Sequence, residues 1–454
     1  MSGLAFAGAN ADWTICIDFG TANSKAAAAP RGGAAPTQVR PLPIARDAAN
    51  PFLMPGAVFI ESGRVLLGAR ALARASEVGP ANREPLQSFK TLLGAPDLQR
   101  SIAALAPKRV DPARLFRQRD LIVMFLAYLM RGVDRAVAAD PVLRRAAPDG
   151  FAFRYARPNW RSDDAASAHR TITRLFDEAR VVARELAEDL DAHEAPIDVA
   201  MKALEKAAAE SMHSSWIEGA IFEAAAAATC HLSGVKANSH AMIVLDVGAG
   251  TTDIGAMAFD GPSAWEIKEA RRTIDLAGDA IDRVLMNLLI EKARHLKRET
   301  ARASVWRELM LEIRDGKETL FSAGRAAFRC GGKVVSLAAR DVLKDPDAAE
   351  IVETIRAAYE EGLLAAVQNV EASGGDALLA VAAGGGARLG LVQSILRNAK
   401  APKRAGRPRL RLERAPVTPA WAEQDAYGGA LASAFPMLAI AIGGALAPPD
   451  LLTM

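Results

Sequence analysis

Residues 15–24 read ICIDFGTANS and residues 242–253 read MIVLDVGAGTTD, and the two stretches repeat one pattern. In each, an apolar strand-like run delivers an aspartate, Asp18 or Asp246, into a turn rich in glycine and threonine. Backbone N–H groups in such a turn can surround a phosphate, and a carboxylate beside it can hold a hydrated metal ion. The sequence therefore predicts two lobes that face one polyphosphate, as in an ATP-binding protein.

The composition is that of an ordinary globular protein. Of the 454 residues, 50% are hydrophobic and 24% are charged, and the net charge is only +3. Bulk charge therefore gives no reason to expect nucleic acid or a membrane as a partner. The apolar run 437–447 is too short to span a bilayer, and residues 1–10 lack the basic start of a signal peptide.

The cysteines and histidines point away from disulfides and zinc. The three cysteines, Cys16, Cys230 and Cys330, include no C-x-x-C pair, which favours reduced thiols and a cytoplasmic location. The six histidines form no H-E-x-x-H motif and no cluster with cysteine. A zinc site is therefore not expected.

Strand and helix patterns alternate along the chain, which predicts an α/β fold. We expect lobe I in residues 1–240, lobe II in 241–420, and a closing helix that returns to lobe I, followed by an apolar tail, in 421–454. Besides the two aspartate motifs, strands are expected at 52–67, 151–155 and 378–381, and helices at 120–137, 165–190, 198–211, 220–230, 279–319 and 391–398.

The glycine motifs differ in how much they specify. Alone, DFGTA at 18–22 fits a plain hairpin turn as well as a phosphate loop. GAGTTD at 248–253 starts like the dinucleotide motif G-x-G-x-x-G, but Asp253 replaces the third glycine and a strand continues at Ile254, which disfavours that site. No Walker-type G-x-x-x-x-G-K-[ST] occurs. AGGGAR at 383–388 fits either a tight turn or a floor for a nucleoside.

Together with further motifs, these stretches resemble the DnaK-type heat-shock ATPases of the actin/hexokinase superfamily, over roughly residues 13–435. The further motifs are SFKTLLG at 88–94, IFEAAAA at 221–227, AGDAID at 277–282, KETL at 317–320 and DAYGGA at 425–430. The resemblance implies an actin-like fold, with two lobes built on mixed sheets around a central cleft. It also implies ATP or ADP and Mg²⁺ as cofactors.

The resemblance implies a role for each candidate site residue. Asp18 and Asp246 would hold Mg²⁺ through water. Lys90 would stabilise charge on the γ-phosphate, Glu223 would orient a water, and Thr251 would lie beside the γ-phosphate. The nucleotide contacts would be Gly20, Thr21, Ala22, Gly248, Ala249, Gly250, Thr252, Gly278, Asp279, Lys317, Gly384, Gly385, Gly386 and Arg388.

Plain structural alternatives stay open for three charged residues of the motifs. Lys90 also fits a solvated lysine at a helix start, and Glu223 fits a helix cap. Asp253 also fits a residue that pairs with a neighbour at a strand edge.

The chain departs from the family where the nucleoside would bind. Glu318 replaces a stacking arginine, Arg314 lies near the displaced acidic ribose contact, and Phe321 replaces a serine. These changes leave the preference for adenine open. Ala249 replaces a glycine, which requires a negative φ at that position.

Three segments fall outside the motifs. Residues 180–212 are expected to form an inserted helix on the first lobe that nucleotide binding does not need. The basic run at 397–414 has no interleaved aromatic residues, so a solvated loop is favoured over nucleic-acid contact. The chain continues only briefly beyond the closing helix, its tail is expected to be frayed or locally docked, and a peptide-binding domain of the family's kind is not expected.

The resulting hypothesis is a monomeric, chaperone-like ATPase that hydrolyses ATP slowly and switches a cleft between two states. Two alternatives stay open: a nucleotide-binding scaffold with little hydrolysis, and an actin-like filament protein. A small-molecule kinase is least favoured, because the sequence shows no sugar-site signature. Nucleotide is the expected partner, and the sequence identifies no client or co-chaperone.

Overall fold

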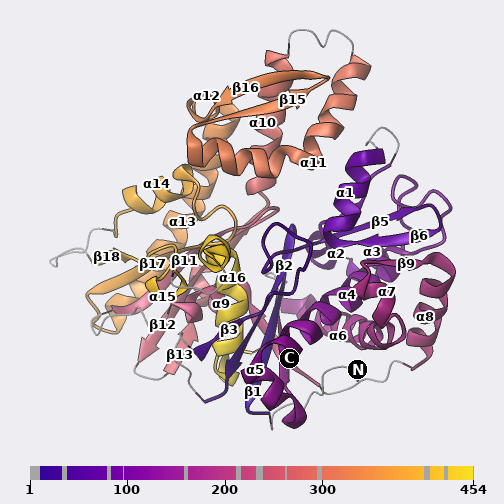
Figure 1. Ribbon diagram of the computed structural model, residues 1–454. Coiled ribbons are helices and arrows are strands. Elements are labelled where there is room, and N and C mark those ends of the chain that lie inside the picture. Colours follow the sequence, from indigo (N-terminus) through magenta and orange to yellow (C-terminus); the bar gives the residue numbers. More distant parts are fainter. Residues whose placement is uncertain are drawn as a thin grey trace. The chain divides into compact units, whose positions relative to one another are not determined.

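A computed structural model describes residues 11–32, 38–78, 83–95, 97–157, 162–210, 216–231, 239–260, 263–293, 299–402, 410–423 and 428–452. The chain forms two compact units. Unit 1 comprises residues 1–74, 84–234 and 418–454, and unit 2 comprises 75–83 and 235–417. Each unit contains a large mixed sheet with helices packed on it, so the expected α/β class is confirmed (Figure 1).

Unit 1 is built on a six-stranded sheet in which the order β10-β8-β1-β2-β3 is joined by β4 on β2. β1 and β2 form an antiparallel hairpin, whereas β1 pairs with β8, and β8 with β10, in parallel. The carboxyl ends of these three parallel strands therefore lie at one edge. The strands are β1 (Trp13–Phe19), β2 (Asn23–Pro30), β3 (Arg40–Pro41), β4 (Met54–Pro55), β8 (Ala152–Arg157) and β10 (Ile217–Phe222).

A smaller sheet with the order β7-β5-β6-β9 completes the strands described in unit 1. It contains β5 (Ala57–Glu61), β6 (Arg64–Leu67), β7 (Leu86–Gln87) and β9 (Glu194–Pro196). Helix α1 (Gly68–Val78) begins in this unit. The other helices are α2 (Phe89–Leu93), α3 (Leu98–Ala103), α4 (Gln118–Ala139), α5 (Pro141–Ala146), α6 (Ser162–Glu185), α7 (Ala187–Asp191), α8 (Ile197–Glu210), α9 (Glu223–Cys230), α15 (Ala420–Glu423) and α16 (Ala430–Leu446), with 3₁₀ turns at 147–149 and 449–451.

The helix expected at 220–230 begins too early. Ala220, Ile221 and Phe222 belong to β10, where they pair with residues 155–157 of β8, and α9 begins at Glu223. The branched and aromatic side chains favour the strand, while the alanines that follow favour the helix. This boundary places Glu223 at the carboxyl end of a parallel strand.

The segment 180–212 is not the single helix that we expected. It contains the end of α6, then α7, β9 and α8, and residues 211–212 lie outside the described part. β9 pairs with β6, and Asp191 forms ion pairs with Arg131 and Arg135 of α4. Because Leu190 and Ala195 are fully buried, the segment belongs to the core of unit 1.

The closing helix α16 packs on α9, β1 and β2 within unit 1, so residues 438–446 of the apolar tail are docked there. Two adjacent glycines allow this approach. A Cβ added to Gly443 would lie 1.7 Å from the carbonyl oxygen of Ala226, and one added to Gly444 would lie 2.4 Å from Sγ of Cys16. Residues 425–427 of the closing motif lie outside the described residues.

A buried arginine fixes the carboxyl end of α16. The Arg154 guanidinium donates a 2.6 Å hydrogen bond to the carbonyl oxygen of Ala447. The same group forms a 2.7 Å ion pair with Glu218 of β10. Arg154 thus satisfies helix-end carbonyl groups that have no partner within the helix.

Unit 2 repeats the arrangement of β1, β2 and β8 with other strands. Its six-stranded sheet has the order β13-β12-β11-β17-β18, with β14 on β12. β11 and β12 form an antiparallel hairpin, and β11 pairs in parallel with β17. The strands are β11 (Ser239–Val247), β12 (Thr252–Asp260), β13 (Ser263–Glu266), β14 (Arg272–Ile274), β17 (Ala377–Ala383) and β18 (Arg411–Arg414).

The helices described in unit 2 surround this sheet and a separate hairpin. They are α10 (Gly278–Lys292), α11 (Glu299–Ala323), α12 (Ala339–Leu343), α13 (Pro346–Ala372) and α14 (Gly390–Asn398), with a 3₁₀ turn at 268–270. The hairpin pairs β15 (Arg325–Cys330) with β16 (Lys333–Ala338). Across the described residues of both units, every helix is too short or too polar to traverse a bilayer.

His231, directly after α9, should make the stability of the protein depend on pH. Its ring is buried and meets Phe435 of α16 edge-on, with the ring centroids 6.0 Å apart. Burial lowers the pKa of His231 to about 4, because the imidazolium would lose its hydration. The unfolded chain takes up the proton near pH 6.5, so stability is full above that pH and falls as the pH drops toward 4.

We expect this histidine to remove up to about 3 kcal/mol of unfolding free energy between pH 6.5 and 4. Urea unfolding of the natural protein and of His231→Gln at several pH values measures the effect. The variant should lose less stability over this interval. Equal pH slopes for the two proteins would show that His231 is not the cause.

Candidate functional site

In unit 1, Asp18 lies at the end of β1 and is paired with a lysine. The hairpin register places it directly opposite Lys25 of β2, so both side chains share one face of the sheet. Lys25 Nζ lies 2.5 Å from Asp18 Oδ2, and the side chains are 9% and 1% exposed. Sequence reasoning missed Lys25, although a lysine following DFGTANS at a cross-strand position was the available signal.

The turn after Asp18 needs its glycine. A Cβ on Gly20 would lie 2.4 Å from the carbonyl oxygen of Asn23. Of the other predicted contacts, Thr21 and Ala22 lie in this turn, and Gly250 lies in the corresponding turn of unit 2.

The predicted catalytic lysine and carboxylate contact each other. Lys90 of α2 forms an ion pair with Glu223, the first residue of α9, and the side chains are 12% and 0% exposed. The alternative of a solvated Lys90 is therefore wrong. Glu223 does lie in the first helical turn, where the helix N-terminus favours a negative charge. Lys90 also lines a small apolar pocket with Phe19 and Tyr155.

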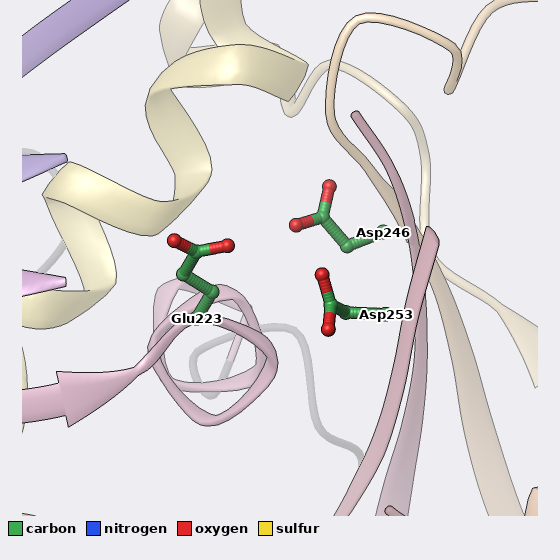
Figure 2. Close-up of side chains that lie close together, drawn as sticks. All are labelled: Glu223, Asp246 and Asp253. Carbon is green, nitrogen blue, oxygen red and sulfur yellow. The ribbon is translucent and has the colours of Figure 1, made fainter. Parts of the chain in front are cut away.

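In unit 2, the second aspartate motif brings two carboxylates together. Asp246 and Asp253 are opposite each other in the β11–β12 hairpin, and both are buried. Their carboxylate oxygens approach within 4.8 Å. Figure 2 shows the two side chains projecting in the same direction from neighbouring strands; it also shows Glu223 of unit 1 at the start of its helix. Two neighbouring buried carboxylates repel each other unless a cation or a proton lies close to them.

Hydroxyl groups hold the second of these carboxylates. Asp253 accepts hydrogen bonds from Oγ1 of Thr251, at 3.1 Å, and of Thr273, at 2.6 Å. Asp253 therefore pairs with neighbouring side chains, as the structural alternative predicted. Thr251, predicted beside the γ-phosphate, points its hydroxyl at this carboxylate.

The glycine turn of the third motif lies against the second motif. Gly384 has φ +80°, and a Cβ there would lie 2.3 Å from Asp246 Oδ1. The N–H of Gly386 donates a 2.8 Å hydrogen bond to the carbonyl of Val247. Gly385 and Arg388 lie in the same turn. Both the backbone conformation and the contact with Asp246 therefore require glycine at position 384.

The first turn of α10 braces the loop at 248–250. The N–H groups of Gly278 and Asp279 donate to the carbonyls of Gly248 and Ala249, at 3.1 Å and 2.7 Å. Ala249 has no positive φ, so its backbone meets the requirement that alanine imposes at this position. Thr252 Oγ1 donates to the carbonyl of Leu276 at 2.7 Å. These hydrogen bonds fix the shape of the loop, and the Thr252 hydroxyl is used in one of them.

The predicted nucleoside contacts on α10 and α11 are tied to one another. Lys317 Nζ lies 2.8 Å from Asp282 Oδ1 and donates to the carbonyl of Gly278 at 3.0 Å. Burial raises the pKa of Asp282, and the Lys317 charge opposes this rise. Arg314 lies 3.3 Å from Asp279, with each side chain 35% exposed. Lys317 is thus an internal brace, and the Arg314–Asp279 pair is the one open to solvent.

Unit 1 therefore carries two buried lysine–carboxylate pairs at or near one edge of its sheet, and unit 2 carries a buried aspartate pair beside two glycine-rich turns. Oxygen donors of this kind suit Mg²⁺, and the turns suit phosphate. Comparison of the chain with known proteins finds no matching family model and no curated protein that matches its sequence.

Proposed function

We propose that this protein is a magnesium-dependent ATPase with an actin-like fold, in which both units bind one nucleotide. The observation that supports this most is a repeated arrangement. Each unit has an antiparallel hairpin with a glycine-containing turn, a buried aspartate near the end of its first strand, and a parallel neighbour of that strand. A single polyphosphate, with a cation between two carboxylates, is the ligand that accounts for both copies.

The residues present fit a magnesium ion. Asp18, Asp246 and Asp253 offer buried carboxylate oxygens, and Asp246 and Asp253 lie close enough to need positive charge nearby. Asp18 and Asp246 would hold the ion through water. When bound, the ion would neutralise charge on the phosphates and fix their oxygens.

The chain's own groups would supply the rest of the reaction. The turn N–H groups would hold the phosphate tail. Glu223 would accept a hydrogen bond from the attacking water and align it with the γ-phosphate. The Lys90 ammonium group would shift its contact from Glu223 toward the γ-phosphate and stabilise the negative charge that develops there. The apolar pocket beside Lys90 would strengthen both interactions by excluding water.

A chaperone-like use of this ATPase follows from the same proposal. A nucleotide that binds both units would favour one arrangement of the cleft, and hydrolysis would release that preference.

The second candidate is a nucleotide-binding scaffold with little hydrolysis. The pairing of Lys90 with Glu223 favours it, because a lysine held by a buried carboxylate has to leave that partner to reach a phosphate. The Arg314–Asp279 pair adds to this, since it puts a positive charge where the nucleoside would lie.

Calorimetric titration with ATP in Mg²⁺ and in EDTA, followed by single-turnover hydrolysis, tests the proposal. We expect Mg²⁺ to tighten ATP binding, and Asp246→Asn to remove most of that gain. Asp376→Asn, on an exposed aspartate of the same unit, is the matched control and should behave as the natural protein does. Absence of ATP binding would overturn the proposal, and Mg²⁺-dependent binding without turnover would support the scaffold. ATP-dependent pelleting would reveal an actin-like filament.

A further inference from the structure

Lys25 is a buried lysine to which the mechanism above gives no part. It is 7% exposed, and a Cβ on Gly20 would lie 2.9 Å from its Nζ. Its ammonium group therefore lies directly beneath the first glycine turn. Resting on the proposed function, we propose that Lys25 is a phosphate-binding residue, which exchanges the carboxylate of Asp18 for a phosphate oxygen when nucleotide binds.

The contacts of the ammonium group leave room for such a ligand. Lys25 Nζ has two partners, Asp18 Oδ2 at 2.5 Å and the carbonyl of Asn23 at 3.2 Å. An ammonium group has three N–H donors, so even if the ion pair with Asp18 takes one, at least one donor has no hydrogen-bond partner among the residues that the structure describes. A buried lysine normally satisfies all of its donors. A phosphate oxygen at this turn would accept a hydrogen bond from this unpaired N–H group.

The neighbouring backbone supplies a second, independent observation. Over the described ranges, the N–H groups of Thr21 and Ala22 donate to no other backbone or side-chain group. Adjacent N–H groups without a partner at a turn are a common anion-binding feature. Lys25, on β2, has its ammonium group beside this turn, so an anion bound there could accept from the turn N–H groups and from the lysine.

Charge balance explains why the lysine would change partners. Among the described residues, Lys25 is the cation paired with Asp18, and it neutralises that carboxylate. A divalent ion held by Asp18 would take over this role and repel the ammonium group. A phosphate oxygen is then the better partner, since it carries at least as much charge as the carboxylate. Metal and phosphate should therefore bind cooperatively at this turn.

The test compares ligands with and without phosphates. Lys25→Met should weaken ATP binding in Mg²⁺ by about 10- to 100-fold, while adenosine affinity changes less than about twofold. Lys202→Met, on an exposed lysine of unit 1, is the matched control and should bind both ligands normally. An unchanged ATP affinity in Lys25→Met, or equal losses for ATP and adenosine, would overturn the inference.

A second pair of variants avoids leaving Asp18 as a lone buried charge. In EDTA, where Asp18 has no metal to hold, Asp18→Asn/Lys25→Met should bind ATP about 10- to 100-fold more weakly than Asp18→Asn alone. Equal affinities would contradict a phosphate contact. If the natural protein bound no ATP under any condition, the proposed function itself would fail, which is a different result from ATP binding that ignores Lys25.

Discussion

Alanine at Lys90 should lower the single-turnover rate of ATP hydrolysis by about 100-fold or more, while ATP affinity changes only a few-fold. The reason is that Lys90 would act on charge that develops at the γ-phosphate, whereas the turn N–H groups hold the ground-state phosphates. A group of this kind contributes mainly to the transition state. Rapid-quench hydrolysis and a parallel binding titration measure the two quantities.

This experiment needs a second variant, because Lys90→Ala removes the cation beside the buried carboxylate of Glu223. Glu223→Gln keeps a hydrogen-bond acceptor for Lys90 without the charge, and it should also lose turnover. Lys108→Ala, on an exposed lysine of unit 1, should hydrolyse ATP normally. Turnover that survives in Lys90→Ala would refute the role given to this lysine.

The largest loss of stability is expected for Gly443→Ala. The added methyl carbon would lie 1.7 Å from the carbonyl oxygen of Ala226, and two packed helices would have to separate to admit it. We expect a loss of at least about 3 kcal/mol in unfolding free energy. Gly390→Ala, which meets no atom within 4 Å, is the control and should change stability little. A Gly443→Ala protein as stable as the natural one in urea unfolding would rule out this tight packing.

Gly444 offers a rescue experiment at the same interface. Its added Cβ would meet the sulfur of Cys16 at 2.4 Å, and a side chain can yield or be shortened. Cys16→Ala/Gly444→Ala should therefore be more stable than Gly444→Ala alone, because the first change removes the clashing atom. A double variant no more stable than the single one would locate the strain elsewhere.

Local sequence patterns predicted the parts of the fold that local physics determines. The two hairpins follow from apolar runs interrupted by glycine turns, and the structure places Asp18 and Asp246 near the ends of their first strands. The start of α9 was misplaced because Ile221 and Phe222 satisfy a helical pattern as well as a buried strand. The parallel pairing with β8, which decides between the two, is not visible in a single segment.

The side-chain partners at the site could not be predicted in the same way. The pairing of Lys25 with Asp18 depends on the hairpin register. That of Lys317 with Asp282 depends on how α10 packs against α11. Both lysines look like ordinary charged residues in the sequence. The segment 180–212 was misjudged for a related reason, since its strand β9 becomes recognisable only through its partner β6.

The account rests on Asp18 and Asp246 acting on one magnesium–nucleotide, and a double-mutant cycle tests this most directly. ATP affinity is measured with and without Mg²⁺ for the natural protein, Asp18→Asn, Asp246→Asn and the double variant. If one ion serves both carboxylates, each single change removes most of the Mg²⁺-dependent gain and the double change removes little more. Losses that add independently, or a full gain retained in either single variant, would contradict a shared site.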